Sequence, residues 1–391
     1  MRLALTDKEA AFRDELRTFY TTEIPADIRD HVRAGLPPQR DDIVTSQRIL
    51  NAHGLAVPNW PVEWGGKEWT AVQYQIWSDE MQLAGVPEPL TFNTKMVGPV
   101  IAQFGSQELK ERFLPPTANL DIWWCQGFSE PEAGSDLASL RTTAVRDGDT
   151  YVVNGQKTWT TLGQYADWIF CLVRTDPQAP KRQAGISFIL IDMDTPGLTV
   201  RPIKLIDGGH EVNEVFFEDV RVPAELLVGE ENQGWTYAKF LLGNERTGIA
   251  GIGRTKLRLA QVKEHATDTS GGNGSVLDDP LFAARIAEVE NELLALELTQ
   301  MRVAADSKDG KPNPASSILK LRGSQLQQAV TELLVEAAGP DALPFDAGDD
   351  IASPGWAQRS APTYLNYRKA SIYGGSNEVQ RNIIASTILG L

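Results

Sequence analysis

Strand-like runs follow one another closely in the middle of the chain, with no helical segment between them. Tyr151 to Thr161 has the pattern of a hairpin that turns at Asn154-Gly155, a pair that tolerates the positive φ angles of a type I′ turn. The later runs are Asp167–Arg174, Gly185–Asp192, Leu198–Ile203 and Val212–Val222. Strands spaced in this way predict a compact antiparallel β domain and exclude a doubly wound parallel sheet.

Helical patterns lie on both sides of this β region. Thr6 and Glu9 form a capping-box pattern at the start of a helix that we expect to end before Pro25. Later helices are predicted from Pro280 to Val303, from Ile318 to Ala338 and from Ser376-Asn377 to Leu389, with a long loop from Gly339 to Pro362. We therefore expect an α+β protein with domains at residues 1–119, 120–233 and 234–391.

Composition limits the classes of partner. The net charge of −15 argues against nucleic acid and against an anionic membrane, since both require a cationic surface. Cys125 and Cys171 lie in apolar segments, so we expect buried free thiols and a reducing, cytoplasmic setting. The N-terminal segment lacks the apolar core of a signal peptide. The four histidines are scattered, and their spacing indicates no metal site.

Two motifs frame the predicted hairpin. WWCQGFSEPEAGSDLASL spans Trp123 to Leu140, and NGQKTWTT spans Asn154 to Thr161. Small residues let backbone N–H groups approach a ligand closely, hydroxyl groups add hydrogen bonds, and Trp159 offers a flat face for a ring system. Each piece alone is typical of an ordinary turn or of a core tryptophan. Together, and in this order, they indicate a binding site.

These segments, with NEVFFEDVRVP from Asn213 to Pro223, resemble the acyl-CoA dehydrogenase family, whose signatures run like GxSEPxAGSD and GxKxWxT. The resemblance implies FAD as cofactor, a central antiparallel β-barrel domain and a C-terminal four-helix bundle. It also implies that Ser135 lies along the phosphopantetheine of the acyl-CoA substrate. The residues that it assigns to the FAD site are Gln126, Phe128, Ser129, Trp159, Thr161, Ser376 and Glu378.

The catalytic base departs from the usual family pattern. Many members carry a Tyr-Glu-Gly-Thr sequence in the C-terminal domain, but the matching stretch here is SIYGGSNEVQR, with Gly374 at the position of the glutamate. Glu245 matches the alternative base position of isovaleryl-CoA-type dehydrogenases, so the resemblance assigns it the α-proton. The competing interpretation is a surface pair between Glu245 and Arg246. The N–H of Gly374 would polarise the thioester carbonyl, and Arg246 would hold the CoA portion.

Half of the FAD site is missing from the sequence. Homomeric members complete the site of a neighbour with an Arg-x-x-Phe-Gly-like loop and a Gln-x-x-Gly-Gly turn. Here the stretch from Lys263 to Pro280 has neither Arg nor Phe, and Val335 to Leu343 has no Gln. This combination resembles the large subunit of pimeloyl-CoA dehydrogenase and the heteromeric steroid side-chain dehydrogenases of bacteria.

That resemblance implies an α2β2 assembly with a second dehydrogenase-like subunit, acting in fatty acid or steroid catabolism. A bulky, carboxylated or steroid side-chain acyl-CoA would become a trans-2-enoyl-CoA, with an electron-transfer flavoprotein as acceptor. Three different interpretations stay open. They are a self-sufficient homomer, a non-catalytic scaffold subunit, and a flavin oxidase or monooxygenase on the same fold.

Overall fold

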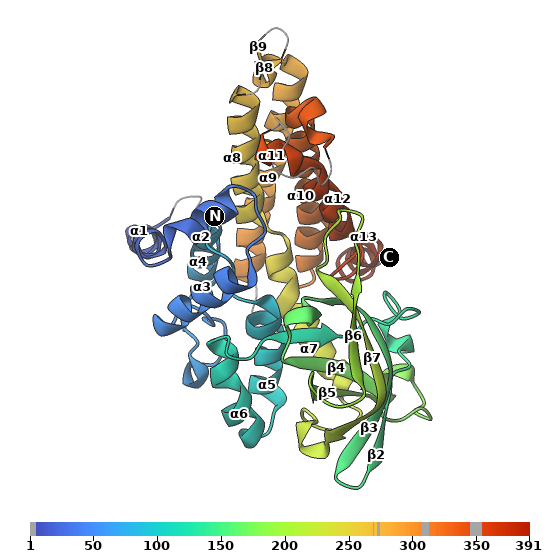
Figure 1. Ribbon diagram of the computed structural model, residues 1–391. Helices are drawn as coiled ribbons and strands as arrows, with labels where there is room; N and C mark the ends of the chain where they lie inside the picture. The colour runs from blue at the N-terminus through green and yellow to red at the C-terminus, as the bar shows by residue number, and fades with distance from the viewer. Residues whose placement is uncertain (1–4, 269, 272–273, 307–312, 345–353) are drawn as a thin grey trace.

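The computed structural model describes residues 5–268, 270–271, 274–306, 313–344 and 354–391, with the backbone alone for residues 244–249, 270–271 and 304–306. Helices form the first part of the chain, a sheet the middle and helices the last part, as Figure 1 shows. The N-terminal α-helices are α1 (Asp7–Thr22), α2 (Ala26–Arg33), α3 (Arg40–Ala52), α4 (Ala71–Leu83), α5 (Gly98–Phe104) and α6 (Gln107–Ala118). The predicted capping box begins α1, where the backbone N–H of Thr6 donates to Glu9 at 2.7 Å, and this helix ends before Pro25.

Seven strands build the central sheet. They are β1 (Trp124–Gly127), β2 (Thr143–Asp147), β3 (Thr150–Thr161), β4 (Trp168–Arg174), β5 (Ile186–Asp192), β6 (Leu198–Ile203) and β7 (Val212–Pro223). Their order is β1-β4-β2-β3-β7-β6, with β5 added on β4. Because β1 and β2 run parallel to β4, the expectation of a purely antiparallel sheet was wrong. Among the described strands, β1 and β6 stand at the two ends of this order and do not pair with each other, so the ladders do not close into a full barrel.

The hairpin turn lies elsewhere than the sequence predicts. β2 and β3 are joined at Gly148-Asp149, and Asn154-Gly155 lie inside β3, where its ladder with β7 shifts register. Gly155 has a φ of +146°, and a Cβ atom there would stand 2.6 Å from the Oγ1 of Thr142. The Asn154 side chain exchanges hydrogen bonds with Asp219 on β7. Asn-Gly therefore serves a bulge here instead of a turn.

The C-terminal region is built on long helices that rise from the sheet in Figure 1. They are α7 (Gly234–Ile249), α8 (Ile252–Asp268), α9 (Pro280–Asp306) and α10 (Ser316–Ala338), followed by the short α11 (Gly355–Gln358), α12 (Ser360–Tyr367) and α13 (Asn377–Ile383), which a π-helical turn (Ile384–Leu389) continues. A short hairpin, β8 (Ser270–Gly271) with β9 (Gly274–Ser275), joins α8 to α9. Helices α8, α9, α12 and α13 all contact α10. The C-terminal domain is thus helical, as predicted, and the short helices α12 and α13 pack with the long helices α8 and α9 around α10.

Two further expectations concern this framework. Cys125 and Cys171 are free and buried, as predicted. The predicted loop from Gly339 to Pro362 contains helical turns at Gly339–Ala342 and at α11, while residues 345–353 lie outside the described residues. Among the described helices, none is long and apolar enough to cross a membrane.

A charged cluster joins the N-terminal helices to α8. The Glu88 carboxylate accepts hydrogen bonds from Arg254 at 2.6 Å, from Lys95 at 3.2 Å and from the amide of Gln82 at 2.6 Å. Burial acts to raise the pKa of Glu88, but the two cations outweigh it and hold the pKa at about 2. The cluster therefore fixes α8 against the segment that follows α4.

We expect Glu88→Gln to lower the free energy of unfolding by about 3 kcal/mol at pH 7. The folded-state pKa lies below the ordinary value of 4.5, so this stabilisation is complete above that pH and is lost as the pH falls towards 2. Urea unfolding between pH 3 and pH 7 should show the variant and the wild type converging at the acid end. Exposed Glu63 provides the control, since Glu63→Gln should follow the wild type at every pH. A loss that does not vary with pH would contradict the electrostatic explanation.

Candidate functional site

Trp159 has an unusual conformation near the end of β3. The β3–β7 ladder shifts register between Lys157 and Thr160, and Trp159 in that gap has a φ of +59°. A left-handed conformation costs a residue with a side chain about 1–2 kcal/mol. The indole side chain is 58% exposed, so it is not the core tryptophan of the competing interpretation. A strained, exposed aromatic surface at this point is available to a flat ligand.

The two sequence motifs meet at this tryptophan. β1 ends at Gly127, where a Cβ atom would lie 2.4 Å from the Sγ of Cys171, so only glycine lets the strand pack here. Two residues later, the carbonyl of Ser129 accepts a hydrogen bond from the Thr158 N–H at 2.9 Å. This bond pairs Ser129 with the residue that precedes Trp159, so the two motifs meet here.

A buried ion pair holds the first motif on β3. The Lys157 ammonium is fully buried and lies 2.7 Å from the Glu130 carboxylate and 3.2 Å from the Phe128 carbonyl. Glu130 also accepts the backbone N–H groups of Arg141 and Thr142 at 2.6 and 2.9 Å. Burial acts to raise the pKa of Glu130, but Lys157 and these hydrogen bonds lower it overall. The pair is ionised, and it ties both ends of the loop from Phe128 to Thr142 to the strand that carries Trp159.

A second set of contacts links the sheet to the C-terminal helices. The Leu162 N–H, just after β3, donates to the Glu211 carbonyl at 2.7 Å. The Glu211 side chain in turn forms an ion pair with Lys369 and accepts a hydrogen bond from Asn366 at 3.4 Å. Asn366 also bonds Asp207 at 2.5 Å. The end of β3 is thereby fixed to the segment that leads into Gly374.

Two glycines follow this segment. Gly374 and Gly375 have φ angles of +63° and +83°, which glycine adopts without strain. Gln380 donates to their carbonyls at 3.4 and 3.1 Å. Among the described residues, no acceptor is hydrogen-bonded to the Gly374 N–H. This N–H can therefore serve a carbonyl oxygen of a ligand.

Helix α13 begins immediately after these glycines. The Ser376 hydroxyl caps it by accepting the Val379 N–H at 3.3 Å, and Glu378 in its first turn is exposed. Asn377 accepts hydrogen bonds from Lys320 and Ser324, at 3.1 and 3.0 Å, which anchor the start of α13 on α10.

The expected base lies on α7. Glu245 and Arg246 are part of this helix, but their side chains lie outside the described residues. The helix ends against α10, where the amide of Gln327 donates to the Ala250 carbonyl at 3.2 Å. The adjacent Gln328 donates to the carbonyls of Tyr367 and Arg368 at 3.3 and 3.0 Å. One turn of α10 thus holds both the end of α7 and the segment that leads into Gly374.

Comparison with known proteins identifies the family. Models of the N-terminal, middle and C-terminal domains of acyl-CoA dehydrogenases match residues 6–121, 125–220 and 232–389. The chain belongs to the acyl-CoA dehydrogenase family. Its members are FAD-dependent oxidoreductases that act on acyl-CoA thioesters.

Similar proteins cover nearly the whole chain. Acyl-CoA dehydrogenase IpdE1 of Mycolicibacterium smegmatis is 33% identical over 395 residues, which are 97% of each chain. FadE26 of Mycobacterium tuberculosis is 35% identical over 401 residues, covering 100% of this chain and 99% of the relative. A chain of the solved ChsE4-ChsE5 complex from Mycobacterium tuberculosis is 34% identical, with a TM-score of 0.85 and coverage of 100% and 99%.

The residues present suit the flavin ring of FAD. Trp159 offers an open aromatic face, and the hydroxyls of Ser129 and Thr161 form no hydrogen bond to another described residue. Phe128 departs from the expected role in one respect. Its ring packs edge-on against Phe170 and Phe188 in the core, at centroid distances of 5.8 and 6.1 Å, so only its backbone can face the flavin.

Two other expected residues are compatible with their roles. Gln126 lies on β1 opposite Phe170 and is partly accessible. Ser135 is exposed in the loop after the buried Glu130, where a long ligand could reach it. Within the described part of the chain, no group of His, Cys, Asp and Glu side chains could hold a metal ion.

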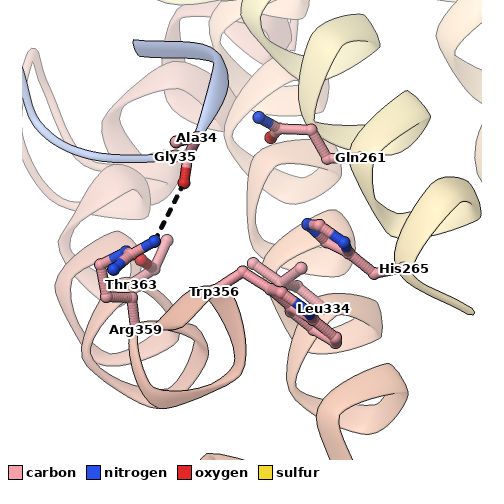
Figure 2. A pocket seen from close by; sticks show the side chains of 8 residues that line it. All are labelled: Ala34, Gly35, Gln261, His265, Leu334, Trp356, Arg359 and Thr363. Atoms are coloured by element: carbon pink, nitrogen blue, oxygen red, sulfur yellow. Dashed lines mark hydrogen bonds between the residues drawn. The ribbon is translucent and has the colours of Figure 1, made fainter. Parts of the chain in front are cut away.

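A small hollow lies away from this site, between residues 34–35 and helices α8 and α10 to α12 (Figure 2). The rings of His265 and Trp356 stack there at 4.0 Å, and Arg359 donates to the Ala34 carbonyl at 3.4 Å. Burial lowers the pKa of His265. None of the residues expected at the FAD or thioester site lines this hollow, so we assign it no catalytic role.

Proposed function

We propose that this chain is the catalytic subunit of a heteromer that oxidises a bulky acyl-CoA to the trans-2-enoyl-CoA. The observation that carries the proposal is the exposed face of Trp159, held in a left-handed conformation beside Ser129 and fixed through Glu211 to the Gly374 segment. The exposed indole face is available to the flat ring of a flavin, and the Gly374 N–H, which bonds no acceptor among the described residues, is available to the thioester carbonyl.

The chain supplies the acid–base part of the reaction. Glu245 removes the α-proton of the thioester, and the Gly374 N–H stabilises negative charge that develops on the thioester carbonyl oxygen. FAD, when bound, supplies the acceptor for the hydride that leaves the β-carbon. Ser129, Trp159 and Thr161 would hold its flavin ring, and Ser376 and Glu378 would contact it at the start of α13. Ser135 and Arg246 would bind the CoA portion.

The partner is proposed from what the sequence lacks. Lys263 to Pro280 contains no arginine or phenylalanine, and Val335 to Leu343 contains no glutamine, so the chain has no evident means to hold the adenine end of a neighbour's FAD. Similar chains occur in two-component assemblies, the ChsE4-ChsE5 complex and the Tcur3481-Tcur3483 steroid dehydrogenase, the latter at 30% identity with a TM-score of 0.85. We propose an α2β2 assembly in the cytoplasm, a steroid-like or carboxylated substrate, and an electron-transfer flavoprotein as acceptor.

Expression of this chain with and without the dehydrogenase-like subunit encoded by an adjacent gene tests the proposed assembly. We expect the co-expressed complex to bind FAD at one equivalent per pair of chains and to form enoyl-CoA, whereas this chain alone should retain little flavin. Bound FAD, determined from the flavin absorbance after denaturation, is the measurement. Full flavin loading of the chain alone would support the self-sufficient homomer and contradict the heteromer.

The same preparation tests for a flavin oxidase and for a scaffold subunit. Peroxide formed stoichiometrically with enoyl-CoA, without an added acceptor, would indicate a flavin oxidase. A complex that binds FAD and keeps its full activity when Glu245 is replaced would indicate a scaffold role for this chain.

A further inference from the structure

Two arginines on α8, Arg254 and Arg258, have no part in the proposed chemistry, and they contact Glu88 and Tyr367. Arg254 and Arg258 are four residues apart, so they share one face of the helix. Like charges at this spacing destabilise a helix by a few tenths of a kcal/mol unless an anion compensates them. Arg254 is paired with Glu88, whereas Arg258 has no carboxylate partner among the described residues.

Tyr367 faces these arginines from the end of α12. A guanidinium N–H of Arg258 donates to the Tyr367 hydroxyl at 3.3 Å, and the guanidinium carbon lies 4.3 Å from the ring centroid. Burial acts to raise the pKa of Tyr367, but Arg258 and Arg254 outweigh it and lower the pKa to about 7. A phenol ionises this readily only where the local potential stabilises negative charge.

The charges of the cluster do not cancel. Glu88 is the one carboxylate that forms an ion pair with Arg254 or Arg258 among the described residues, and Lys95 also binds it. With Arg258 the cluster carries an excess of positive charge, in a chain whose net charge is −15. Arg254 also keeps 48% of its side chain accessible, so a ligand can reach it.

The cluster lies beside both segments that the proposed function assigns to the thioester. Gln327 of α10 holds the end of α7, and Gln328 holds the carbonyl of Tyr367 and the Ser371 hydroxyl, three residues before Gly374. An acyl group that starts between Glu245 and Gly374 and extends along α8 would meet Arg254 and Arg258.

We propose that Arg254, Arg258 and the Tyr367 hydroxyl form a receptor for a carboxylate at the far end of the acyl group. This inference rests on the proposed function, and it narrows the substrate to acyl-CoA thioesters that carry a second, distal carboxylate. Arginine suits this task, because its planar guanidinium can bind a carboxylate through two parallel hydrogen bonds.

The test uses matched substrates on the FAD-loaded complex. The mono-CoA thioesters of straight-chain dicarboxylic acids of increasing length are compared with their ω-methyl esters, by kcat, KM and calorimetric binding. The wild type should favour the free acid at one chain length. Arg258→Gln should lower kcat/KM for that acid by about 10- to 100-fold, the range for one lost charge-assisted hydrogen bond, and leave the methyl ester almost unchanged.

Two further variants separate the explanations. Tyr367→Phe removes the hydroxyl without removing a cation. It should lower kcat/KM for the free acid and not for the ester, by a smaller factor than Arg258→Gln does. Lys256→Gln removes a cation of α8 that pairs with Glu297 on α9, and it should leave kcat/KM unchanged for both substrates. An equal loss on acid and ester in Arg258→Gln would mean that the arginine binds a CoA phosphate or only stabilises the fold, and would overturn the receptor.

Failure of the receptor can be distinguished from failure of the proposed function. A wild-type complex that dehydrogenates acid and ester equally well would refute the receptor and leave the dehydrogenase intact. A complex that turns over neither would refute the proposed function. Calorimetry would then still test the receptor. Tighter binding of the free acid than of its ester would support it, and equal binding would refute it.

Discussion

Replacing Glu245 with glutamine is expected to lower kcat for enoyl-CoA formation by about 10²- to 10⁴-fold, the usual contribution of a positioned general base. The amide has nearly the same shape as the carboxylate but cannot accept the α-proton. Binding of acyl-CoA and the FAD content of the complex should stay close to those of the wild type. Rapid mixing with acyl-CoA, followed by flavin absorbance, measures the rate of the step that needs the base.

Glu230 provides a matched control for this variant. It is exposed in the loop just before α7, so Glu230→Gln makes the same change of charge near the same helix. Its rate should equal that of the wild type. If Glu245→Gln also reacts at the wild-type rate, the base is another group, or the partner subunit carries the reaction and this chain is a scaffold. Loss of FAD from Glu245→Gln would instead point to a structural role for the residue.

The sequence predicted those features that depend on neighbouring residues. Thr6 and Glu9 indicated the start of α1, and Pro280 indicated the start of α9, because caps and helix breakers act over one turn. The four later strand runs were also correct, since alternation and β-branched side chains are visible locally. Which strands pair is a different matter. The parallel pairing of β1 with β4 joins residues more than 40 positions apart and leaves no local signal.

The same limit applies to the site. Trp159 and Ser129 could be selected from motifs, but their meeting depends on the Lys157–Glu130 pair, which is formed across 27 positions. Asn154-Gly155 and Gly148-Asp149 were both able to form a turn. The register of β3 against β7, a tertiary property, decided between them. The Arg254, Arg258 and Tyr367 cluster was missed because its members come from helices 109 positions apart, and an i, i+4 arginine pair alone is typical of a solvated helix face.

Breaking the Lys157–Glu130 pair should have the largest effect on stability. Glu130→Gln removes one charge and leaves a fully buried ammonium ion without its counter-ion, which is expected to cost about 3–5 kcal/mol. The amide can still accept one of the two backbone N–H groups of Arg141 and Thr142, so the loop that carries Glu130 keeps part of its attachment. The unfolding midpoint in urea, measured on the FAD-free chain, reports the loss without a contribution from flavin binding.

A double variant decides whether the cost arises from the unpaired charge. In Glu130→Gln with Lys157→Met no charge remains buried, so much of the lost stability should return, as it does when a buried pair is replaced by an apolar side chain of similar volume. The Glu132–Arg141 pair, at 2.8 Å, offers the exposed counterpart in the same segment, with side chains 72% and 79% accessible. Glu132→Gln should cost less than about 1 kcal/mol. If the double variant is as unstable as the two single variants combined, Glu130 acts mainly through its backbone hydrogen bonds. The ion pair would then contribute little to the stability of the structure around Ser129 and Trp159.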